Sequence, residues 1–357
     1  MFSNPLVKSF RLLLFPFAII YGLAVWIRNW LYDKSFLSST AFGLPVICVG
    51  NLSLGGTGKS PMVEYLVRLL QNEYKVATLS RGYKRKTRGY ALANKGTTAL
   101  DIGDEPLQFY HKFPGVPVAV GEERLVAIPQ LLHDCPDTAA IILDDAFQHR
   151  TIKAGLNIVL TEYGNLFTRD FFLPAGDLRD VRKSYKRASV IVVTKCAADL
   201  DESEKVNIIS EINPTPLQSV FFTTILYSTP YHITSRLLYK IEDLTEVLLV
   251  TGIANPRPLK KYLEDNIQTY SMMHYGDHHV FSIDDWKDIK TRFNSIQTTN
   301  RIILTTEKDA MRLLKFEDEL ANLPLYVIPI EHSFLFHEGN GFNSIIKGFI
   351  NNFKQPI

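Results

Sequence analysis

The segment Val46–Pro61 (VICVGNLSLGGTGKSP) constrains the fold of this chain more than any other part of its 357 residues. Its apolar start predicts a β-strand, its glycines a tight loop, and the residues from Lys59 onward a helix with a polar first turn. Glycines let backbone N–H groups turn toward phosphate oxygens, the lysine adds a positive charge, and the Ser60 hydroxyl suits Mg²⁺. The segment therefore predicts a phosphate-binding loop. The residues expected to hold a nucleotide are Ser53, Leu54, Gly55, Gly56, Thr57, Gly58, Lys59 and Ser60.

One position of this loop departs from the strict Walker A pattern. Ser53 stands where that pattern has glycine, six residues before the lysine. The alternative interpretation is a Gly-rich turn followed by a chance Lys-Ser pair. The strand–loop–helix context favours the phosphate loop.

A pair of acids follows a second apolar run. Ala139–Leu143 predicts a buried strand, and Asp144 and Asp145 come directly after it. This is the Walker B arrangement, in which a carboxylate binds Mg²⁺ directly or through water. The alternative is a pair of solvated loop acids, which a phosphate loop upstream disfavours.

Apolar β-rich runs alternate with helical patterns along the chain. Most of the predicted strands are apolar on both faces, as in a covered parallel sheet. We therefore expect a doubly wound, P-loop NTPase-like α/β domain and a smaller α/β domain, joined by a β connector and preceded by an apolar helix. The expected segments are a membrane-associated helix at 1–35, the P-loop domain at 36–215, the connector at 216–245 and the smaller domain at 246–357. The predicted strands are Val46–Val49, Lys75–Leu79, Val116–Val120, Ala139–Leu143, Leu156–Leu160, Ser189–Val193, Val220–Thr224, Val247–Val250, Arg301–Leu304 and Leu325–Ile330.

Composition excludes several classes of protein. Hydrophobic residues make up 46% and charged residues 21% of the chain, so it is neither disordered nor a polytopic membrane protein. Its net charge of +2 argues against a dedicated nucleic-acid coat. Three cysteines without a CxxC pair predict reduced thiols in a cytosolic compartment. No feature calls for an obligate protein partner.

The run Leu12–Ile27 (LLLFPFAIIYGLAVWI) carries no charge. It is shorter than the about 20 apolar residues of a full membrane span, and Pro16 should interrupt its first turns. One interpretation is a buried core helix. The other, which we favour because the run is apolar all round, is a helix in a membrane surface with Trp26, Trp30 and Arg28 at the headgroups.

Two segments approach the guanine-reading pattern of P-loop GTPases without matching it. In Thr194-Lys195-Cys196-Ala197 an alanine replaces the aspartate that reads guanine. In Thr306-Glu307-Lys308-Asp309 an extra glutamate separates the threonine from the lysine. ATP is therefore the expected nucleotide, with Mg²⁺.

Two basic clusters, Arg81–Arg88 and Arg179–Arg187, indicate an anionic amphiphile or an anionic membrane surface as partner. A kinase acting on a hydroxyl also needs a base. The two candidates are the acidic turn Gly103-Asp104-Glu105-Pro106 and the pair Asp277-His278. Either one, taken alone, is also compatible with an ordinary turn or helix cap.

These motifs together resemble the tetraacyldisaccharide 4′-kinases of the lipid A pathway of Gram-negative bacteria. The resemblance runs from the apolar N-terminus to about residue 312. It rests on the number and order of the motifs, since each is weak alone. They are VGNL and GGTGKSP (49–52 and 55–61), SRGY (80–83), GDEP (103–106), DDAFQH (144–149), LPAGDLRD (173–180), GIANP (252–256), DH (277–278) and TEKDA (306–310).

The resemblance implies transfer of the γ-phosphate of ATP to the 4′-hydroxyl of a tetraacyl glucosamine disaccharide 1-phosphate, an anionic glycolipid. It implies work at the cytoplasmic face of the inner membrane. By analogy Asp104 is the base, with His278 paired to it across a cleft, and Lys59 stabilises transferring charge. Arg179, also expected to be catalytic, and Asp180 stand where the family has a functional Arg-Glu pair. Ser60, Glu105, Asp144 and Asp145 would organise Mg²⁺.

This chain differs from the family pattern at Asp180, which stands where the family often has glutamate and is one methylene shorter. Two other functions remain open on the sequence. One is a P-loop GTPase or ATPase switch acting on a protein partner. The other is a P-loop ligase or small-metabolite kinase in which Leu12–Ile27 is a core helix.

Overall fold

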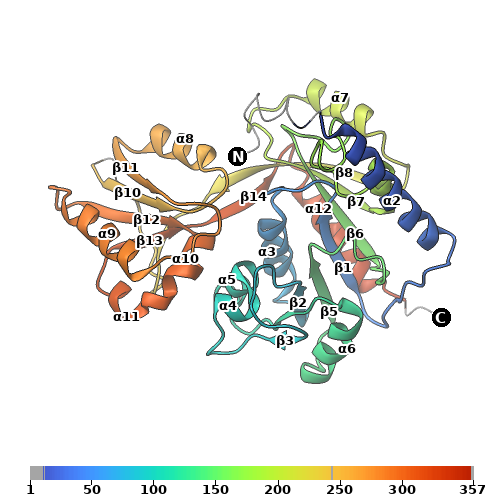
Figure 1. The fold of residues 1–357 in the computed structure, drawn as a ribbon, viewed down its shortest axis with the longest axis horizontal. Coiled ribbons are helices and arrows are strands. Elements are labelled where there is room, and N and C mark those ends of the chain that lie inside the picture. Colours follow the sequence, from blue (N-terminus) through green and yellow to red (C-terminus); the bar gives the residue numbers. More distant parts are fainter. Residues whose placement is uncertain (1–10, 12, 243, 355–357) are drawn as a thin grey trace. The chain divides into compact units, whose positions relative to one another are not determined.

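The computed structural model describes residue 11 and residues 13–242 and 244–354. These residues form two compact units (Figure 1). The larger unit comprises the chain up to Leu226 and again from His332 onward, and the smaller one comprises Tyr227–Glu331. The chain therefore leaves the larger unit and later returns to it.

A mostly parallel sheet forms the centre of the larger unit. Its strands are β1 (Val46–Asn51), β2 (Val76–Ser80), β3 (Ala91–Leu92), β4 (Val118–Val120), β5 (Ala140–Asp144), β6 (Leu156–Glu162), β7 (Val190–Thr194), β8 (Ser219–Tyr227) and β14 (Ile330–Phe334). In the described residues their order is β14-β8-β7-β6-β1-β5-β2-β4-β3. Strand β1 is central and pairs in parallel with β5 and β6. The phosphate loop and the Asp144–Asp145 pair therefore leave neighbouring strands at the same edge of the sheet.

Helices cover both faces of this sheet. Alternate residues of β1 face opposite sides, so Ile47 and Val49 pack with α3, α5 and α12, whereas Val46 and Cys48 pack in the cluster that includes α6 and α7. This double covering explains why most residues of the central strands are apolar. The helices are α2 (Phe15–Asp33), α3 (Lys59–Leu70), α4 (Ala99–Ile102), α5 (Asp104–Lys112), α6 (Arg124–Asp134), the 3₁₀ helix η1 (Arg182–Arg187), α7 (Glu202–Ile212) and α12 (Gly339–Asn351).

The smaller unit is a second α/β arrangement. Its sheet has the order β11-β10-β12-β13-β9 in the described residues. Strands β11, β10, β12 and β13 are parallel and β9 is antiparallel to β13. The elements are β9 (Tyr231–His232), β10 (Glu246–Thr251), α8 (Arg257–Asn266), β11 (Thr269–His274), α9 (Ile283–Asn294), β12 (Arg301–Thr306), α10 (Glu307–Leu313), the 3₁₀ helix η2 (Leu314–Phe316), α11 (Glu317–Leu320) and β13 (Leu325–Ile328).

The expected α/β fold class is confirmed, but two expected boundaries are wrong. We expected 246–357 to form the smaller domain and 216–245 to be a separate connector. Instead, β8 and β14 join the sheet of the larger unit, and α12 packs Phe342 and Ile346 into its core. The C-terminal segment belongs with the larger unit because its aromatic and aliphatic side chains complete that core.

The N-terminal helix α2 packs against the larger unit through small and polar residues. Ala18 and Asn29 are buried, and a Cβ at Gly22 would lie 2.7 Å from the ring of Phe172. Pro16 lies in the first turn, where its missing N–H costs no hydrogen bond, so the expected interruption does not occur. Residues 1–10 and Leu12 of the expected N-terminal segment lie outside the described residues.

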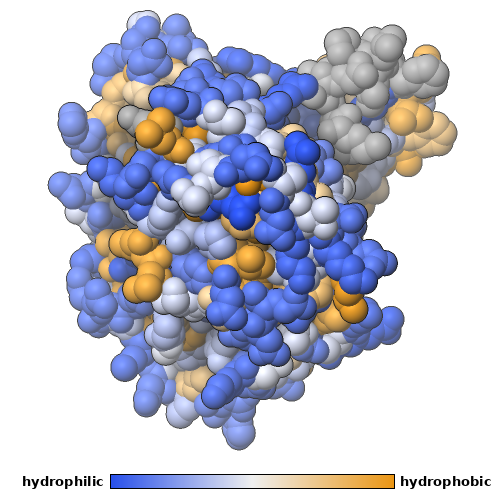
Figure 2. Space-filling view, turned by 90° about the vertical axis from the view of Figure 1, so that its left-hand side faces the viewer, coloured by the Kyte–Doolittle hydropathy of each residue, from blue (hydrophilic) through white to orange (hydrophobic). Residues whose placement is uncertain are grey.

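The large apolar side chains of α2 point away from the larger unit. Their exposed fractions are 62% for Phe17, 58% for Ile19, 66% for Ile20, 54% for Leu23 and 54% for Trp26. By contrast, hydrophilic residues predominate on the face shown in Figure 2, and hydrophobic ones form small separate groups there. Among the described residues, none of the helices combines the length and apolar character needed to cross a membrane.

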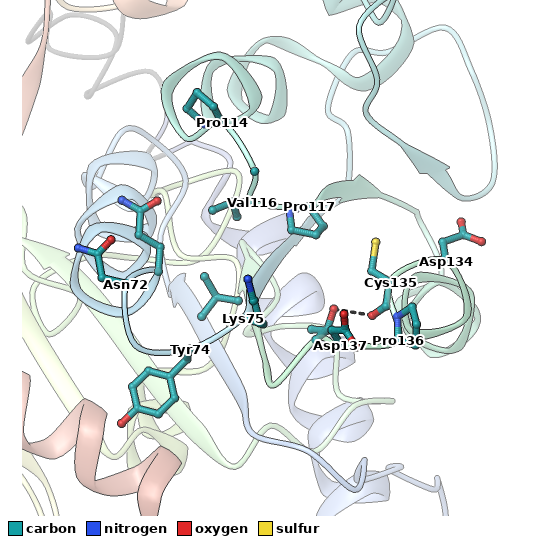
Figure 3. A pocket seen from close by; sticks show the side chains of 14 residues that line it. Asn72, Tyr74, Lys75, Pro114, Val116, Pro117, Asp134, Cys135, Pro136 and Asp137 are labelled. Carbon is teal, nitrogen blue, oxygen red and sulfur yellow. Dashed lines mark hydrogen bonds between the residues drawn. The ribbon is translucent and has the colours of Figure 1, made fainter.

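A surface pocket of about 520 Å³ lies at the amino ends of the parallel strands of the large sheet (Figure 3). Its lining includes Lys75, Pro117 and Thr138, which precede β2, β4 and β5. The motif residues instead follow the carboxyl ends of the strands. The pocket is therefore separate from the site described next.

Candidate active site

The phosphate loop is shaped by two glycines in the left-handed region. Gly55 has φ +112° and Gly58, which directly precedes α3, has φ +87°. A side chain is strained in such a backbone, so glycine is required at this turn. A Cβ at Gly55 or Gly56 would meet no atom within 4 Å, so this part of the loop is open to a ligand. The loop thus leads into the N-terminus of α3 as the sequence predicts.

Two side chains hold the back of the loop through its carbonyl groups. Thr194 of β7 donates its hydroxyl to the Thr57 carbonyl at 2.9 Å. The His332 Nε2 lies 2.9 Å from the Gly58 carbonyl and its Nδ1 lies 2.9 Å from the Thr223 hydroxyl. Because a carbonyl can only accept, His332 carries its proton on Nε2. Burial lowers the pKa of His332 to about 4, so the ring is neutral near pH 7.

The departure at Ser53 has a structural explanation. Ser53 is buried and forms a β-bridge with Leu178. On either side of this bridge, the Leu54 N–H donates to the Asp177 carbonyl at 2.7 Å and the Arg179 N–H donates to the Leu52 carbonyl at 2.8 Å. The first part of the loop is therefore paired with a neighbouring segment, and this pairing brings Arg179 to the site.

Lys59, Arg179 and Asp145 form the charged centre of the site. The Arg179 guanidinium donates to both carboxylate oxygens of Asp145 and to the side chain of Asn51. The Lys59 Nζ lies 3.2 Å from Asn51 Oδ1 and 3.8 Å from Asp145 Oδ1. Burial opposes ionisation of Asp145, but Lys59 and Arg179 outweigh it, and the pKa of Asp145 is lowered. Burial and the Arg179 charge lower the pKa of Lys59 despite the acids around it.

The neighbouring carboxylates fit a magnesium ion. Ser60 Oγ donates to Glu105 Oε1 at 2.9 Å, and Ser80 Oγ donates to Asp144 Oδ2 at 3.2 Å. The other carboxylate oxygen of Asp144 is buried with no hydrogen-bond partner. Burial, followed by the charges of Glu105 and Asp145, raises the pKa of Asp144. A divalent cation would satisfy the orphaned oxygen and favour the ionised form.

No group of three His, Cys, Asp or Glu residues suited to hold a metal alone occurs in the described part of the chain. Nucleotide enzymes supply one or two carboxylates to Mg²⁺ and leave the other positions to phosphate oxygens and water, so only part of the expected set would contact the ion directly. The expected ligands Ser60, Glu105, Asp144 and Asp145 belong to one unit and lie at the same edge of one sheet. The donor set therefore suits Mg²⁺ bound together with a nucleotide.

A buried ion pair fixes α5 to α3. Glu64, one turn beyond Ser60, accepts from Gln108 Nε2 and Lys112 Nζ, both at 2.6 Å. Gln108 lies one turn beyond Asp104, the first residue of α5. This contact sets the positions of the two helix N-termini, so the candidate base Asp104 begins a helix that is anchored beside the phosphate loop.

Positive charge collects around His149, four residues beyond Asp145. Burial and the nearby charges of Arg124, Arg28 and Arg81 lower the pKa of His149 to about 4. Arg124 is 3% exposed, and its Nε has no hydrogen-bond partner. An anionic group of a ligand would relieve both the mutual repulsion and the unsatisfied donor.

Several members of the expected basic clusters have structural partners instead. Arg85 pairs with Glu122 at 2.7 Å, and Arg187 pairs with Asp180 at 2.9 Å. Asp180 is 1% exposed and also accepts from Asn29 of α2 at 2.7 Å. Asp180 therefore anchors the N-terminal helix, whereas the preceding Arg179 faces the phosphate loop.

In the smaller unit, the expected residues follow the carboxyl ends of its parallel strands. His278 lies in the loop after β11 and has φ +60°, a strained value for a side chain of this size. Its N–H donates to the Gly252 carbonyl at 3.2 Å, directly after β10. Asp104 belongs to the larger unit, so the pairing of Asp104 with His278 stays a prediction.

Comparisons with known proteins decide the family. The family model described as tetraacyldisaccharide-1-P 4′-kinase matches residues 10–351. The chain belongs to this family. The tetraacyldisaccharide 4′-kinase of Flavobacterium johnsoniae is 46% identical over 94% of this chain and 96% of its own length. The corresponding protein of Bacteroides thetaiotaomicron is 43% identical over 94% and 92%.

A solved structure agrees with this assignment. LpxK from Aquifex aeolicus, crystallised in complex with ATP, is 27% identical and superposes with a TM-score of 0.76 over 96% of this chain and 99% of its own. The expected P-loop fold and family are therefore confirmed.

For this member of the 4′-kinase family, sequence reasoning missed several site residues. Asn51, Arg124 and His332 carry contacts described above but were not expected to act. Asn51 and Arg124 each stand at or just beyond the carboxyl end of a strand, which is a usable signal. His332 reaches the loop only through a contact across 274 residues, which no local pattern reveals.

Proposed function

We propose that this chain transfers the γ-phosphate of ATP to the 4′-hydroxyl of a tetraacyl glucosamine disaccharide 1-phosphate. The observation that carries the proposal is the grouping of Lys59, Arg179 and Asp145 beside an open phosphate loop, in a chain of the 4′-kinase family. Phosphoryl transfer depends mainly on positioning and on neutralising charge. A loop with two cations and nearby carboxylates supplies both.

The residues of the larger unit take distinct roles in this reaction. Lys59 and Arg179 offset the charge that develops on the transferring phosphoryl group. Ser60, Glu105, Asp144 and Asp145 would hold Mg²⁺ directly or through water, and the ion would neutralise phosphate charge. Asp104 accepts the proton of the acceptor hydroxyl, and His278 from the smaller unit assists it. A general base contributes about 10²–10⁴-fold to such a step.

The acceptor is an anion, and the cluster of Arg124, Arg81 and His149 offers a region of matching charge. Its members lie near one another, and Arg124 also lies near Asp145. In our proposal this region attracts the anionic headgroup of the lipid while its hydroxyl reaches the phosphate loop.

Helix α2 brings the enzyme to the membrane that holds its lipid substrate. Its small and polar residues contact the protein and its large apolar side chains are exposed, which is the reverse of an ordinary surface helix. Such a face suits the boundary between headgroups and acyl chains. The proposed location is the cytoplasmic face of the inner membrane.

Binding to vesicles tests this location. The purified full chain should sediment together with vesicles of phosphatidylethanolamine and phosphatidylglycerol. Replacing Ile20 and Leu23 with aspartate should weaken binding at least about tenfold, because two large side chains leave the apolar phase. Val206→Asp is the matched control, since Val206 is also exposed (61%) but lies on α7. Equal binding by the α2 variant and the wild type would contradict the proposal.

The reaction itself is tested by transfer of label from γ-labelled ATP to the tetraacyl disaccharide 1-phosphate in mixed micelles with Mg²⁺. We expect a labelled lipid, and none with Lys59→Ala. Free labelled phosphate without labelled lipid would instead support the alternative of an NTPase switch. The structure gives that alternative no support, because Lys195 pairs with Glu162 and Thr194 holds the phosphate loop.

A further inference from the structure

The motif Thr306–Ala310 has no part in the function proposed above, yet it organises the loops around His278. Asp309 is fully buried, and its Oδ2 accepts from the Thr306 hydroxyl at 2.7 Å, the Thr251 hydroxyl at 3.1 Å and the Gly252 N–H at 2.9 Å. Its other oxygen accepts from Arg312 NH1 at 3.1 Å. One buried carboxylate thus joins the ends of β10 and β12 to the first turns of α10.

Arg312 connects the buried Asp309 to His278. Its NH2 group lies 3.0 Å from His278 Nδ1. A guanidinium group has only donors and keeps its protons in proteins, so Nδ1 must be the acceptor of this bond. The ring of His278 therefore carries its proton on Nε2. On that side, the carboxylate of Asp277 lies 4.0 Å away.

The backbone of His278 is also fixed by the same group of residues. Its N–H donates to the carbonyl of Gly252, whose own N–H donates to Asp309. A left-handed conformation at a histidine persists only where its surroundings hold it. Both the backbone and the ring of His278 are thus tied to the buried pair Asp309–Arg312.

We propose that Arg312, anchored by Asp309, is a positioning residue that fixes His278 in its Nε2–H tautomer. His278 then presents a proton donor toward the reaction and cannot accept the proton of the acceptor hydroxyl. Within the proposed function, on which this inference rests, His278 acts as a hydrogen-bond donor through Nε2–H, and the base is a carboxylate. The TEKDA motif of this chain serves to hold that tautomer.

Nuclear magnetic resonance of the full chain labelled with ¹⁵N-histidine tests this inference without any turnover. The resonances of His278 are identified by their loss in His278→Asn. In the wild type, Nδ1 should show the shift of an unprotonated ring nitrogen and Nε2 that of a protonated one. In Arg312→Met, His278 should show a mixture of the two neutral tautomers. A proton on Nδ1 in the wild type, or unchanged shifts in Arg312→Met, would overturn the proposal.

Turnover gives a second readout. Arg312→Met should lower kcat about 10- to 100-fold, the usual effect of losing a hydrogen bond to a charged group, with the KM for ATP unchanged. Arg312→Lys keeps a donor and should restore part of kcat. Arg301→Met is the matched control, because Arg301 lies in the same unit but donates to the carbonyls of Phe293 and Ile296. Loss of activity in this control equal to that in Arg312→Met would mean that Arg312 is merely structural, and would overturn the proposal.

Failure of the proposed function would look different. If His278→Asn turns over at the wild-type rate while the tautomer still depends on Arg312, the role of His278 in the reaction is wrong and the positioning by Arg312 stands. If the tautomer is independent of Arg312 while His278→Asn is inactive, the positioning by Arg312 is wrong and the role of His278 in the reaction stands.

Discussion

Replacing His332 should weaken ATP binding although this residue is buried behind the phosphate loop. His332 is 5% exposed and donates from Nε2 to the Gly58 carbonyl, while its Nδ1 accepts from Thr223. The Gly58 carbonyl also accepts from the Met62 N–H at 3.1 Å, so it keeps one partner when the histidine is lost. His332→Leu therefore removes two hydrogen bonds and orphans the Thr223 hydroxyl.

The magnitude follows from these contacts. Each lost hydrogen bond costs about 0.5–1.5 kcal/mol, and an orphaned buried polar group about 1–3 kcal/mol. The free energy of unfolding should therefore fall by about 2–6 kcal/mol. If about 1 kcal/mol of the lost free energy comes from loosening of the phosphate loop, ATP must order the loop again when it binds. The Kd for ATP then rises about fivefold. The Km for the lipid should be unchanged.

Calorimetric titration with ATP, together with urea unfolding, measures both effects. His332→Gln is the matched variant, because its amide can donate to Gly58 from nearly the same place and should keep most of the affinity. Thr223→Val tests the Nδ1 side alone. A folded His332→Leu protein that binds ATP as tightly as the wild type would refute the reasoning, as would equal loss in the Leu and Gln variants.

Three further predictions concern other residues. Asp104→Ala and His278→Ala should each lower turnover by about 10²–10⁴-fold in a kinetic assay, with calorimetric ATP affinity retained; wild-type turnover in both would remove the proposed pair. Asp180→Ala should lower the free energy of unfolding in urea by about 3–5 kcal/mol, because it leaves the half-buried Arg187 without its carboxylate; an unchanged midpoint would show that this carboxylate does not anchor α2. Stability should also fall between about pH 6.5 and pH 4, because burial lowers the pKa of His332 and of His149 to about 4 and the unfolded chain then binds more protons than the folded one. At about 1.4 kcal/mol per pH unit, His332 alone contributes about 3 kcal/mol of this loss, and His332→Gln should be correspondingly less sensitive to acid in thermal melts at a series of pH values.

The sequence was sufficient for the elements that carry a continuous pattern. The segments Val46–Val49 and Ala140–Leu143 are apolar at every position because both faces of the sheet are covered. Strand β11 was missed, since Thr269–His274 is half-exposed and mixes polar with apolar residues. Strands β3 and β9 have two residues each, too few to show any period.

The candidate site was predictable where chemistry follows directly from residue type and place in a motif. Lys59, Ser60 and Asp145 belong to this group. The place of Ser53 in the loop is explained by its bridge to Leu178, and Asp180 is buried where it contacts Asn29 of α2. These are contacts between distant segments, which local periodicity does not encode. Local periodicity also does not show that the C-terminal segment returns to the larger unit. There, His332 of β14 contacts the phosphate loop.

Identifying the position of the new phosphate tests the central claim most directly. The full chain is incubated with ATP, Mg²⁺ and tetraacyl disaccharide 1-phosphate in mixed micelles, and the lipid product is analysed by ³¹P–¹H correlation NMR. We expect a second phosphomonoester coupled to the proton on C4′, formed by the wild type and not by Lys59→Ala. A phosphate at another position, or consumption of ATP by folded protein with no phosphorylated lipid, would contradict the account.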